Sequence, residues 1–150
     1  MSQRRAWLRV LALAPYVELA GSVAAFDALP AYERVRGPEI GLAMVRGRAG
    51  GDGAPFNLGE MTVTRCTVRV ATTGDEARDG FACVAGRAPL HAELAAVCDA
   101  LLQSPAWRDL VVRRVIAPAE TALAEKRTLR ARQRAATKAD FVTVVRSGEA

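Results

Sequence analysis

The stretch GLAMVRGRAGGDGAPFNLGEMTVTRCTVRVATTGDEARDGFACVAGR, residues 41–87, decides the fold of this chain. Over much of it apolar residues alternate with polar or small ones, which is the two-residue period of a β-strand. The turn signals GGDG and TTGDEAR interrupt this alternation and favour hairpins. The stretch therefore predicts strands that pair antiparallel, and a further short strand is expected before them at residues 32–37.

Both predicted hairpins have a preferred register, because matching apolar residues across a strand pair buries one face of the sheet. Symmetrical closure of the first hairpin places Met44 opposite Met61. In the second hairpin, pairing Val68 with Phe81 gathers the apolar side chains on one face. That predicted core face consists of Val70, Val68, Cys66, Phe81, Cys83 and Ala85.

Helical periodicity appears on both sides of the strands. Apolar residues at helical spacing predict one helix over residues 3–14 and a second over residues 15–27. Pro89 and Pro105 each stand at the first position of a later predicted helix. The buried stripe of the helix that begins at Pro89 is expected to contain Leu90, Leu94, Val97, Leu101 and Leu102. This order predicts an α+β fold, in which an antiparallel β-sheet is flanked by N-terminal and C-terminal helices.

The last part of the chain is basic. Nine lysines and arginines but only three acids lie between Arg113 and Arg146, so this part carries +6 while the whole chain carries +5. Its predicted helix has only Leu123 and Leu129 as large apolar residues, too few for the core to hold it alone. We predict a single domain over residues 1–150, in which residues 113–146 form a basic helical arm and a terminal strand, DFVTVVR, that dock onto a partner.

Composition narrows the class of protein. Of the 150 residues, 51% are apolar and 25% are charged, as in globular domains. Arg9, Pro15 and Glu18 interrupt the apolar N-terminal stretch, so we expect neither a signal peptide nor a membrane span, and a cytoplasmic location. The three cysteines form no CxxC pair, which favours reduced, buried thiols over a metal site.

Four basic side chains are candidates for contact with an anion or a partner: Arg65, Arg69, Arg87 and His91. Arg87 and His91 stand at the start of a predicted helix, where free N–H groups favour anions. Arg65 and Arg69 share one strand face about 13 Å apart. The alternatives are a local hydrogen bond for His91 and plain solvation for the arginines. No catalytic residue is predicted, because no activated serine, second carboxylate or metal cluster accompanies His91.

Five stretches together resemble a known family. They are W-x-x-x-L-A at residues 7–12, G-L followed by R-x-G-G-x-G-x-x-F at 41–56, G-E-x-T-x-T-R at 59–65, G-R-x-x-x-H-A-E at 86–93 and F-x-T-x-V-R at 141–146. In this order they are similar to the PhnG family, whose members belong to the bacterial carbon–phosphorus lyase system of phosphonate degradation. The resemblance spans residues 5–146.

The resemblance implies one component of a hetero-oligomeric core complex that also contains the H, I and J subunits and works with the ATPase-like L subunit. It implies that the complex displaces adenine from MgATP with a phosphonate such as methylphosphonate, giving α-D-ribose 1-methylphosphonate 5-triphosphate. The I subunit carries the nucleosidase-type chemistry. The resemblance further implies that the PhnG component alone binds no cofactor and that MgATP is a substrate of the complex.

Three alternatives to this function stay open at the level of sequence. These alternatives are a nucleic-acid-binding module, a purely structural scaffold, and an enzyme that needs no partner. Nucleic acid is not the expected partner, because aromatic residues make up only 5% of the chain and none lies among the arginines of the basic arm.

Overall fold

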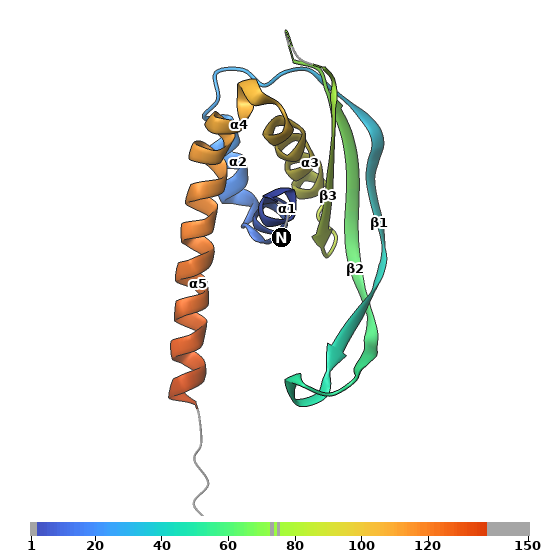
Figure 1. Ribbon diagram of the computed structural model, residues 1–150, viewed down its shortest axis with the longest axis vertical. Coiled ribbons are helices and arrows are strands. Elements are labelled where there is room, and N and C mark those ends of the chain that lie inside the picture. Colours follow the sequence, from blue (N-terminus) through green and yellow to red (C-terminus); the bar gives the residue numbers. More distant parts are fainter. Residues whose placement is uncertain (1–2, 73, 75, 138–150) are drawn as a thin grey trace, which may run out of the picture.

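The computed structural model describes residues 3–72, 74 and 76–137. One antiparallel sheet has the strand order β1-β2-β3, formed by β1 (Tyr32–Arg48), β2 (Pro55–Val70) and β3 (Arg78–Ala85). One face of this sheet carries α1 (Gln3–Leu13), α2 (Tyr16–Ala24), α3 (Pro89–Gln103), α4 (Pro105–Val111) and α5 (Ala117–Ala136), as Figure 1 shows. The predicted α+β class is confirmed. The predicted terminal strand at residues 141–146 lies outside the described residues.

The core lies between the sheet and α3, which crosses the inner face of β2 and β3 (Figure 1). Small residues of α3, among them Ala92, Ala96 and Ala100, allow the helix to approach the sheet closely, and α1 and α4 cover its other side. Leu90 does not join the buried stripe predicted for this helix. It lies in the first turn of α3 and is 63% exposed. No single described helix is long and apolar enough to cross a membrane. The bent pair α1 and α2 reaches that length and composition when the two helices are taken together.

The second hairpin differs from the predicted register by one residue. Val68 pairs with Gly80 and Cys66 with Ala82, so Phe81 and Cys83 lie on the outer face of the sheet. Phe81 is accordingly 39% exposed. The physical reason is the closeness of α3, which leaves room beside Val68 for a glycine but not for an aromatic ring.

The first hairpin is also displaced by one residue from the predicted register. Met44 pairs with Glu60 instead of Met61, because the turn closes two residues more tightly than predicted and brings Arg48 opposite Pro55. One extra residue in β2, between the pairs Arg46–Asn57 and Val45–Gly59, recovers one of these two residues. The extra residue is Leu58. The short strand predicted at residues 32–37 is the first part of β1, which continues through two further irregularities.

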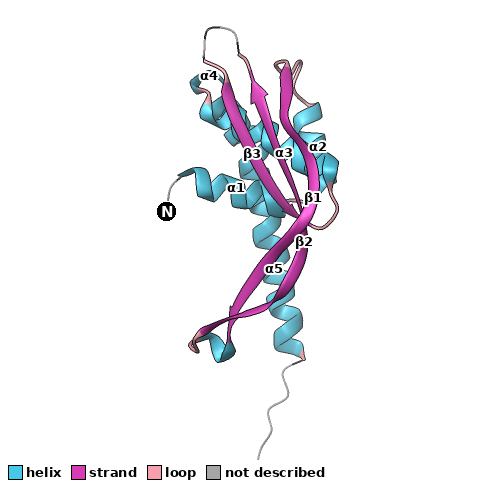
Figure 2. Cartoon of the chain, turned by 90° about the vertical axis from the view of Figure 1, so that its right-hand side faces the viewer, coloured by secondary structure: helices cyan, strands magenta, loops and turns pink. Residues whose placement is uncertain are grey.

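Two parts of the chain extend beyond the body of the domain. β3 pairs with β2 only from Val63 to Val70, so residues 42–62 form a two-stranded β-ribbon with no third strand. Residues of α5 after Leu123 are all exposed. Figures 1 and 2 show the β-ribbon and the second half of α5 projecting in the same direction, past α1 and α3.

Candidate functional site

His91 is a buried residue that ties α3 to the end of α1. It is 8% exposed, and its Nε2 lies 2.8 Å from the backbone oxygen of Leu11. Because a carbonyl oxygen only accepts, Nε2 carries the proton and donates it to this bond. The ring also lies against Tyr16, with 6.2 Å between the ring centroids. His91 therefore makes the local hydrogen bond that was the alternative to an anion contact, and its role toward an anion or a partner stays a prediction.

The structure does not bring the four candidate residues together. Arg65 and Arg69 lie on the outer face of β2, whereas His91 belongs to the helix packed against the inner face. Arg69 is already paired, since it donates to both carboxylate oxygens of Asp79, at 2.7 and 2.9 Å. This guanidinium holds the pKa of Asp79 below its usual value. Arg65 donates to the backbone oxygen of Leu42 at 3.3 Å, and Arg87 is exposed in the loop before α3.

Glu93, two residues after His91, forms a polar cluster that the sequence did not predict. Arg34 of β1 donates to its two oxygens at 2.8 and 3.0 Å, and the Tyr32 hydroxyl donates at 2.9 Å. The hydrogen bonds from Arg34 lower the pKa of the Glu93 carboxyl, against the opposing effect of burial. The cluster borders an open hollow of about 250 Å³, whose other lining residues are Tyr16, Leu90 and Leu94. Glu93 is the last residue of the motif G-R-x-x-x-H-A-E, so the sequence marked this acid. Nothing in the sequence marked its partner Arg34 on β1, which is 59 residues away.

Replacement of Glu93 by glutamine is expected to destabilise the protein at neutral pH and to matter less in acid. Because the pKa of Glu93 is lowered in the folded state from its ordinary 4.5, its stabilising contribution is present above that pH. The contribution is lost as the pH falls through the lower, folded-state value. Urea denaturation of both proteins at pH 7 and about pH 3 measures this, and the gap between their midpoints should narrow in acid.

The control for this variant is Glu39→Gln, which removes an exposed ion pair with Arg36. Exposed pairs contribute little to stability, so its midpoint should match the wild type at both pH values. A gap for Glu93→Gln that stays the same from pH 7 to acid would contradict a role for the carboxylate charge.

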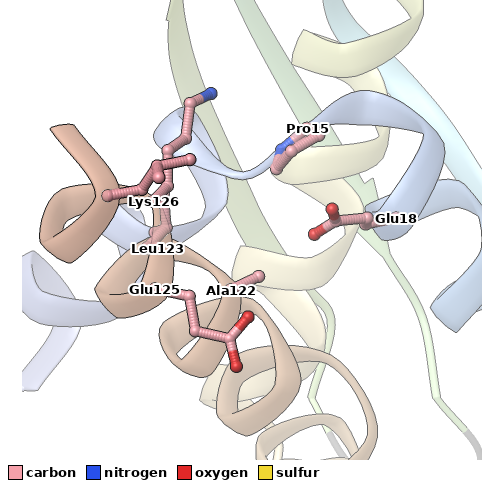
Figure 3. A pocket seen from close by; sticks show the side chains of 7 residues that line it. Pro15, Glu18, Ala122, Leu123, Glu125 and Lys126 are labelled. Carbon is pink, nitrogen blue, oxygen red and sulfur yellow. The ribbon is translucent and has the colours of Figure 1, made fainter. Parts of the chain in front are cut away.

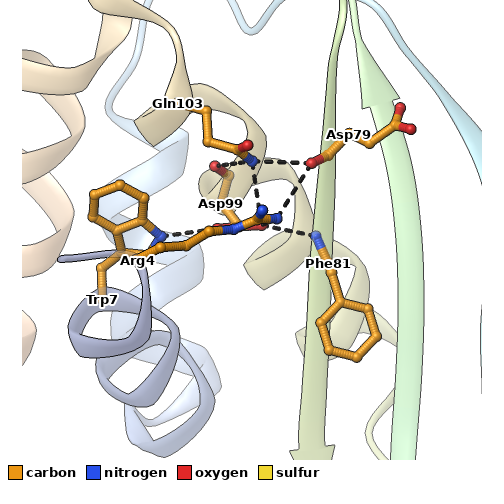
Figure 4. Close-up of polar contacts among 6 residues, drawn as sticks. All are labelled: Arg4, Trp7, Asp79, Phe81, Asp99 and Gln103. Atoms are coloured by element: carbon orange, nitrogen blue, oxygen red, sulfur yellow. Dashed lines mark hydrogen bonds and ion pairs between the residues drawn. The ribbon is translucent and has the colours of Figure 1, made fainter. Parts of the chain in front are cut away.

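Asp99 lies at the centre of a second buried cluster, which joins α1, β3 and α3 (Figure 4). Its fully buried carboxylate accepts hydrogen bonds from Arg4 at 2.7 Å, from Trp7 Nε1 at 2.8 Å and from the backbone N–H of Phe81 at 2.9 Å. Gln103 donates to the backbone oxygens of Asp79 and Asp99 beside it. Both oxygens of the Asp99 carboxylate accept hydrogen bonds from α1, and one also accepts from β3, so the cluster joins these elements to α3.

The cysteines are free thiols in two environments. Cys66 and Cys98 are buried as expected, and burial raises the pKa of Cys98 to about 12. Cys83 was expected in the core but is exposed on the outer face, a consequence of the one-residue shift in register. Within residues 3–72, 74 and 76–137, no three His, Cys, Asp or Glu side chains are grouped closely enough to hold a metal ion.

A hollow of about 470 Å³ lies where α5 passes the corner between α1 and α2 (Figure 3). Pro15, Leu123 and Leu129 give it apolar walls, and Glu18 and Lys126 stand at its edge. The hollow is partly open to solvent. It marks the place where α5 leaves the core.

The sequence matches known proteins along almost its whole length. The family model described as "Phosphonate metabolism protein PhnG" matches residues 2–147. A protein of Rhizobium meliloti (strain 1021), "Alpha-D-ribose 1-methylphosphonate 5-triphosphate synthase subunit PhnG", is 45% identical over 146 residues, which are 97% of this chain and 90% of that protein. The resemblance found in the five sequence motifs is confirmed, and this chain belongs to the PhnG family of phosphonate metabolism proteins.

Proposed function

We propose that this chain is the PhnG component of an α-D-ribose 1-methylphosphonate 5-triphosphate synthase, a transferase complex of organophosphonate catabolism. The observation that carries the proposal is the 45% identity to the Rhizobium meliloti protein of that name, which runs through 97% of this chain. The geometry agrees with a component of a complex, because the polar clusters around Asp99 and Glu93 are satisfied within the chain while the β-ribbon and α5 are exposed.

The proposed reaction is a substitution at the ribose carbon of MgATP. A phosphonate oxygen forms a bond to that carbon while the bond to adenine breaks, and adenine leaves with a proton. The proposed partners are the I, H and J subunits, together with the ATPase-like L subunit, and the nucleosidase-type step belongs to the I subunit. The PhnG chain needs no cofactor of its own, and its proposed location is the cytoplasm, where free thiols persist.

The proposed contribution of the PhnG chain is to make phosphonate, and not water, the nucleophile. A bound protein does this by excluding water from the reacting carbon or by positioning the phosphonate against it. Of the four candidates for anion contact, Arg65 and Arg87 have exposed side chains, whereas Arg69 is held by Asp79 and His91 is buried. Arg65 and Arg87 are therefore the first residues to test.

Reconstitution of the complex tests the proposed function. This chain is expressed with the I, H, J and L subunits, and adenine release from MgATP is measured with and without methylphosphonate. We expect phosphonate-dependent adenine release and the ribose 1-methylphosphonate product, seen by phosphorus NMR, only when this chain is present. Equal product without it would contradict the proposal, as would turnover by the isolated chain.

The same assay separates a role in the chemistry from a role in assembly alone. Arg65→Ala and Arg87→Ala should assemble normally if these side chains contact the phosphonate, but they should form less product and release more adenine by hydrolysis. Arg132→Ala, at an exposed site on α5, is the control. Full product formation by both variants would leave the PhnG chain as a scaffold.

A further inference from the structure

The β-ribbon exposes apolar side chains that a domain of this size would normally cover. Its large apolar residues are between 39% and 61% exposed: Leu42, Met44, Phe56, Leu58 and Met61. A two-stranded hairpin without a third strand or a packed helix is only marginally stable in water. Large apolar side chains exposed on one side of such an element, here Leu42 and Met44, favour a protein-binding site.

The inner side of the β-ribbon continues the core-facing side of the sheet. Directly opposite residues of an antiparallel pair point to the same face. Leu42 pairs with Thr62 and Met44 with Glu60, and both partners share a face with the fully buried Thr64 two or four residues further on. Leu42 and Met44 therefore extend the apolar core surface beyond the point where α3 covers it.

The exposed half of α5 supplies a different chemistry. From Lys126 to Ala136 it carries five cations and no acid, and none of the five forms an ion pair with a described residue. Lys126 and Arg130 follow the buried Ala119 and Leu123 at helical spacing, so they continue the side of α5 that faces the body. Arg132 lies on the opposite side. The β-ribbon, by contrast, has two cations and two acids within residues 42–62 and is neutral.

Both elements project from the same end of the domain and face each other, as the two perpendicular views show (Figures 1 and 2). The hollow beside Pro15 and Leu129 lies where α5 passes the corner between α1 and α2. We propose that the β-ribbon and α5 form a clasp for one partner protein of the complex, which offers an apolar surface to Leu42 and Met44 and an acidic surface to Lys126 and Arg130. This inference rests on the proposed function for the existence of a partner, and it adds where and how that partner binds.

The charges favour an acidic protein surface over the other possible occupants. A second copy of this chain would bring a further net charge of +5 toward the cationic helix. A nucleic acid would suit α5 but would leave the apolar side of the β-ribbon exposed to water, and α5 has no aromatic side chain for base stacking. A partner that is apolar on one side and acidic on the other satisfies both arms at once.

Paired substitutions in the assembled complex test the clasp. Leu42→Thr combined with Met44→Thr keeps strand propensity while removing the apolar surface. We expect recovery of the partner with tagged protein to fall about tenfold or more, whereas Val35→Thr, at an exposed valine on β1 outside the β-ribbon, should have little effect. Arg130→Glu should lower recovery several-fold at low salt, with a smaller loss at high salt, and Arg132→Glu on the far side of α5 should not.

A second measurement does not depend on any variant. Hydrogen exchange of the wild-type chain, alone and in the complex, reports which backbone N–H groups become protected. Within residues 42–62, protection should rise on assembly at the edges of the β-ribbon that have no strand partner, and the thermal midpoint of each isolated variant shows whether it still folds.

The outcomes separate this inference from the proposed function. If wild-type protein recovers no partner, the proposed function fails and the clasp fails with it. If wild type assembles but the double threonine and Arg130→Glu variants assemble equally well, with no new protection in the β-ribbon, only the clasp is wrong. Protection that arises from a dimer of this chain, or from nucleic acid, would overturn the assignment of the occupant.

Discussion

Replacement of Gly80 by alanine is expected to destabilise the protein by about 3 kcal/mol or more, which lowers the thermal midpoint by about 10 °C. A Cβ built on Gly80 would overlap the backbone oxygen of Ala96, and it would lie 2.7 Å from the backbone nitrogen of Ala100. These are backbone atoms of α3, so no side-chain rotation relieves the overlap. The helix must move away from β3, and contacts along the core must loosen.

Thermal and urea denaturation, followed by circular dichroism, measure this change. The matched control is Gly21→Ala, since a Cβ on Gly21 in α2 meets nothing within 4 Å. That variant should be slightly more stable than wild type, by up to about 1 kcal/mol, because alanine is the better helix former. Equal stability of Gly80→Ala and wild type would mean that α3 does not lie as close to β3 as described.

Replacement of Asp99 by alanine is expected to cost about 3–5 kcal/mol of stability. The substitution leaves the buried Trp7 indole N–H and the Phe81 backbone N–H without their acceptor, and it leaves the Arg4 guanidinium without its counter-ion. Since these three donors lie on α1 and β3, the loss should loosen α1 from the sheet. Trp7 then provides a local report, because its fluorescence should change as the indole meets water.

Asp109→Ala on the exposed side of α4 is the control for Asp99→Ala, and it should unfold at the wild-type urea concentration. Asp99→Asn keeps an acceptor of the same shape and should fall between the two. If the alanine and asparagine variants were both as stable as wild type, the cluster would not be the joint that holds α1. Both Gly80→Ala and Asp99→Ala should reduce assembly of the complex only as far as they reduce the folded fraction, which separates them from the β-ribbon variants.

The local order of this fold could be predicted because it is encoded in short patterns. The alternation in residues 41–87 and the glycine-rich turns predicted the strands, and Pro89 and Pro105 marked the starts of α3 and α4. The scarcity of large apolar residues after Leu123 predicted an exposed arm, and α5 is exposed from there on. Each of these features depends on neighbours within a few residues.

The predicted registers were wrong because register depends on what packs on the sheet and on how the turn closes, not on the strands alone. Judged from the sequence, pairing Phe81 with Val68 gathered more apolar side chains on one face of the sheet. The close approach of α3 instead requires glycine at the position opposite Val68, and this turns Phe81 and Cys83 outward. In the first hairpin the turn brings Arg48 opposite Pro55, and the extra residue Leu58 recovers only part of the difference from the predicted register.

At the candidate site, too, the sequence marked individual residues but did not predict their partners. The sequence singled out His91 as the only histidine and Arg69 as an exposed cation, but the structure gives each a partner within the chain, Leu11 and Asp79. A sequence motif included Glu93, but no local pattern distinguishes Asp99 from ordinary helix residues. The partners of both acids, on β1 and α1, could not be predicted because they are 59 to 95 residues away.

By itself the sequence determined the class of fold, the positions of its elements, the basic C-terminal arm and, through five ordered motifs, the family. These are properties of spacing, composition and residue identity along the chain. Only the tertiary structure decided the registers, the partners of the buried acids, and the projection of the β-ribbon and α5 from one end of the domain. The physical reason is that burial and charge pairing depend on distances between residues far apart in sequence, which no local pattern contains.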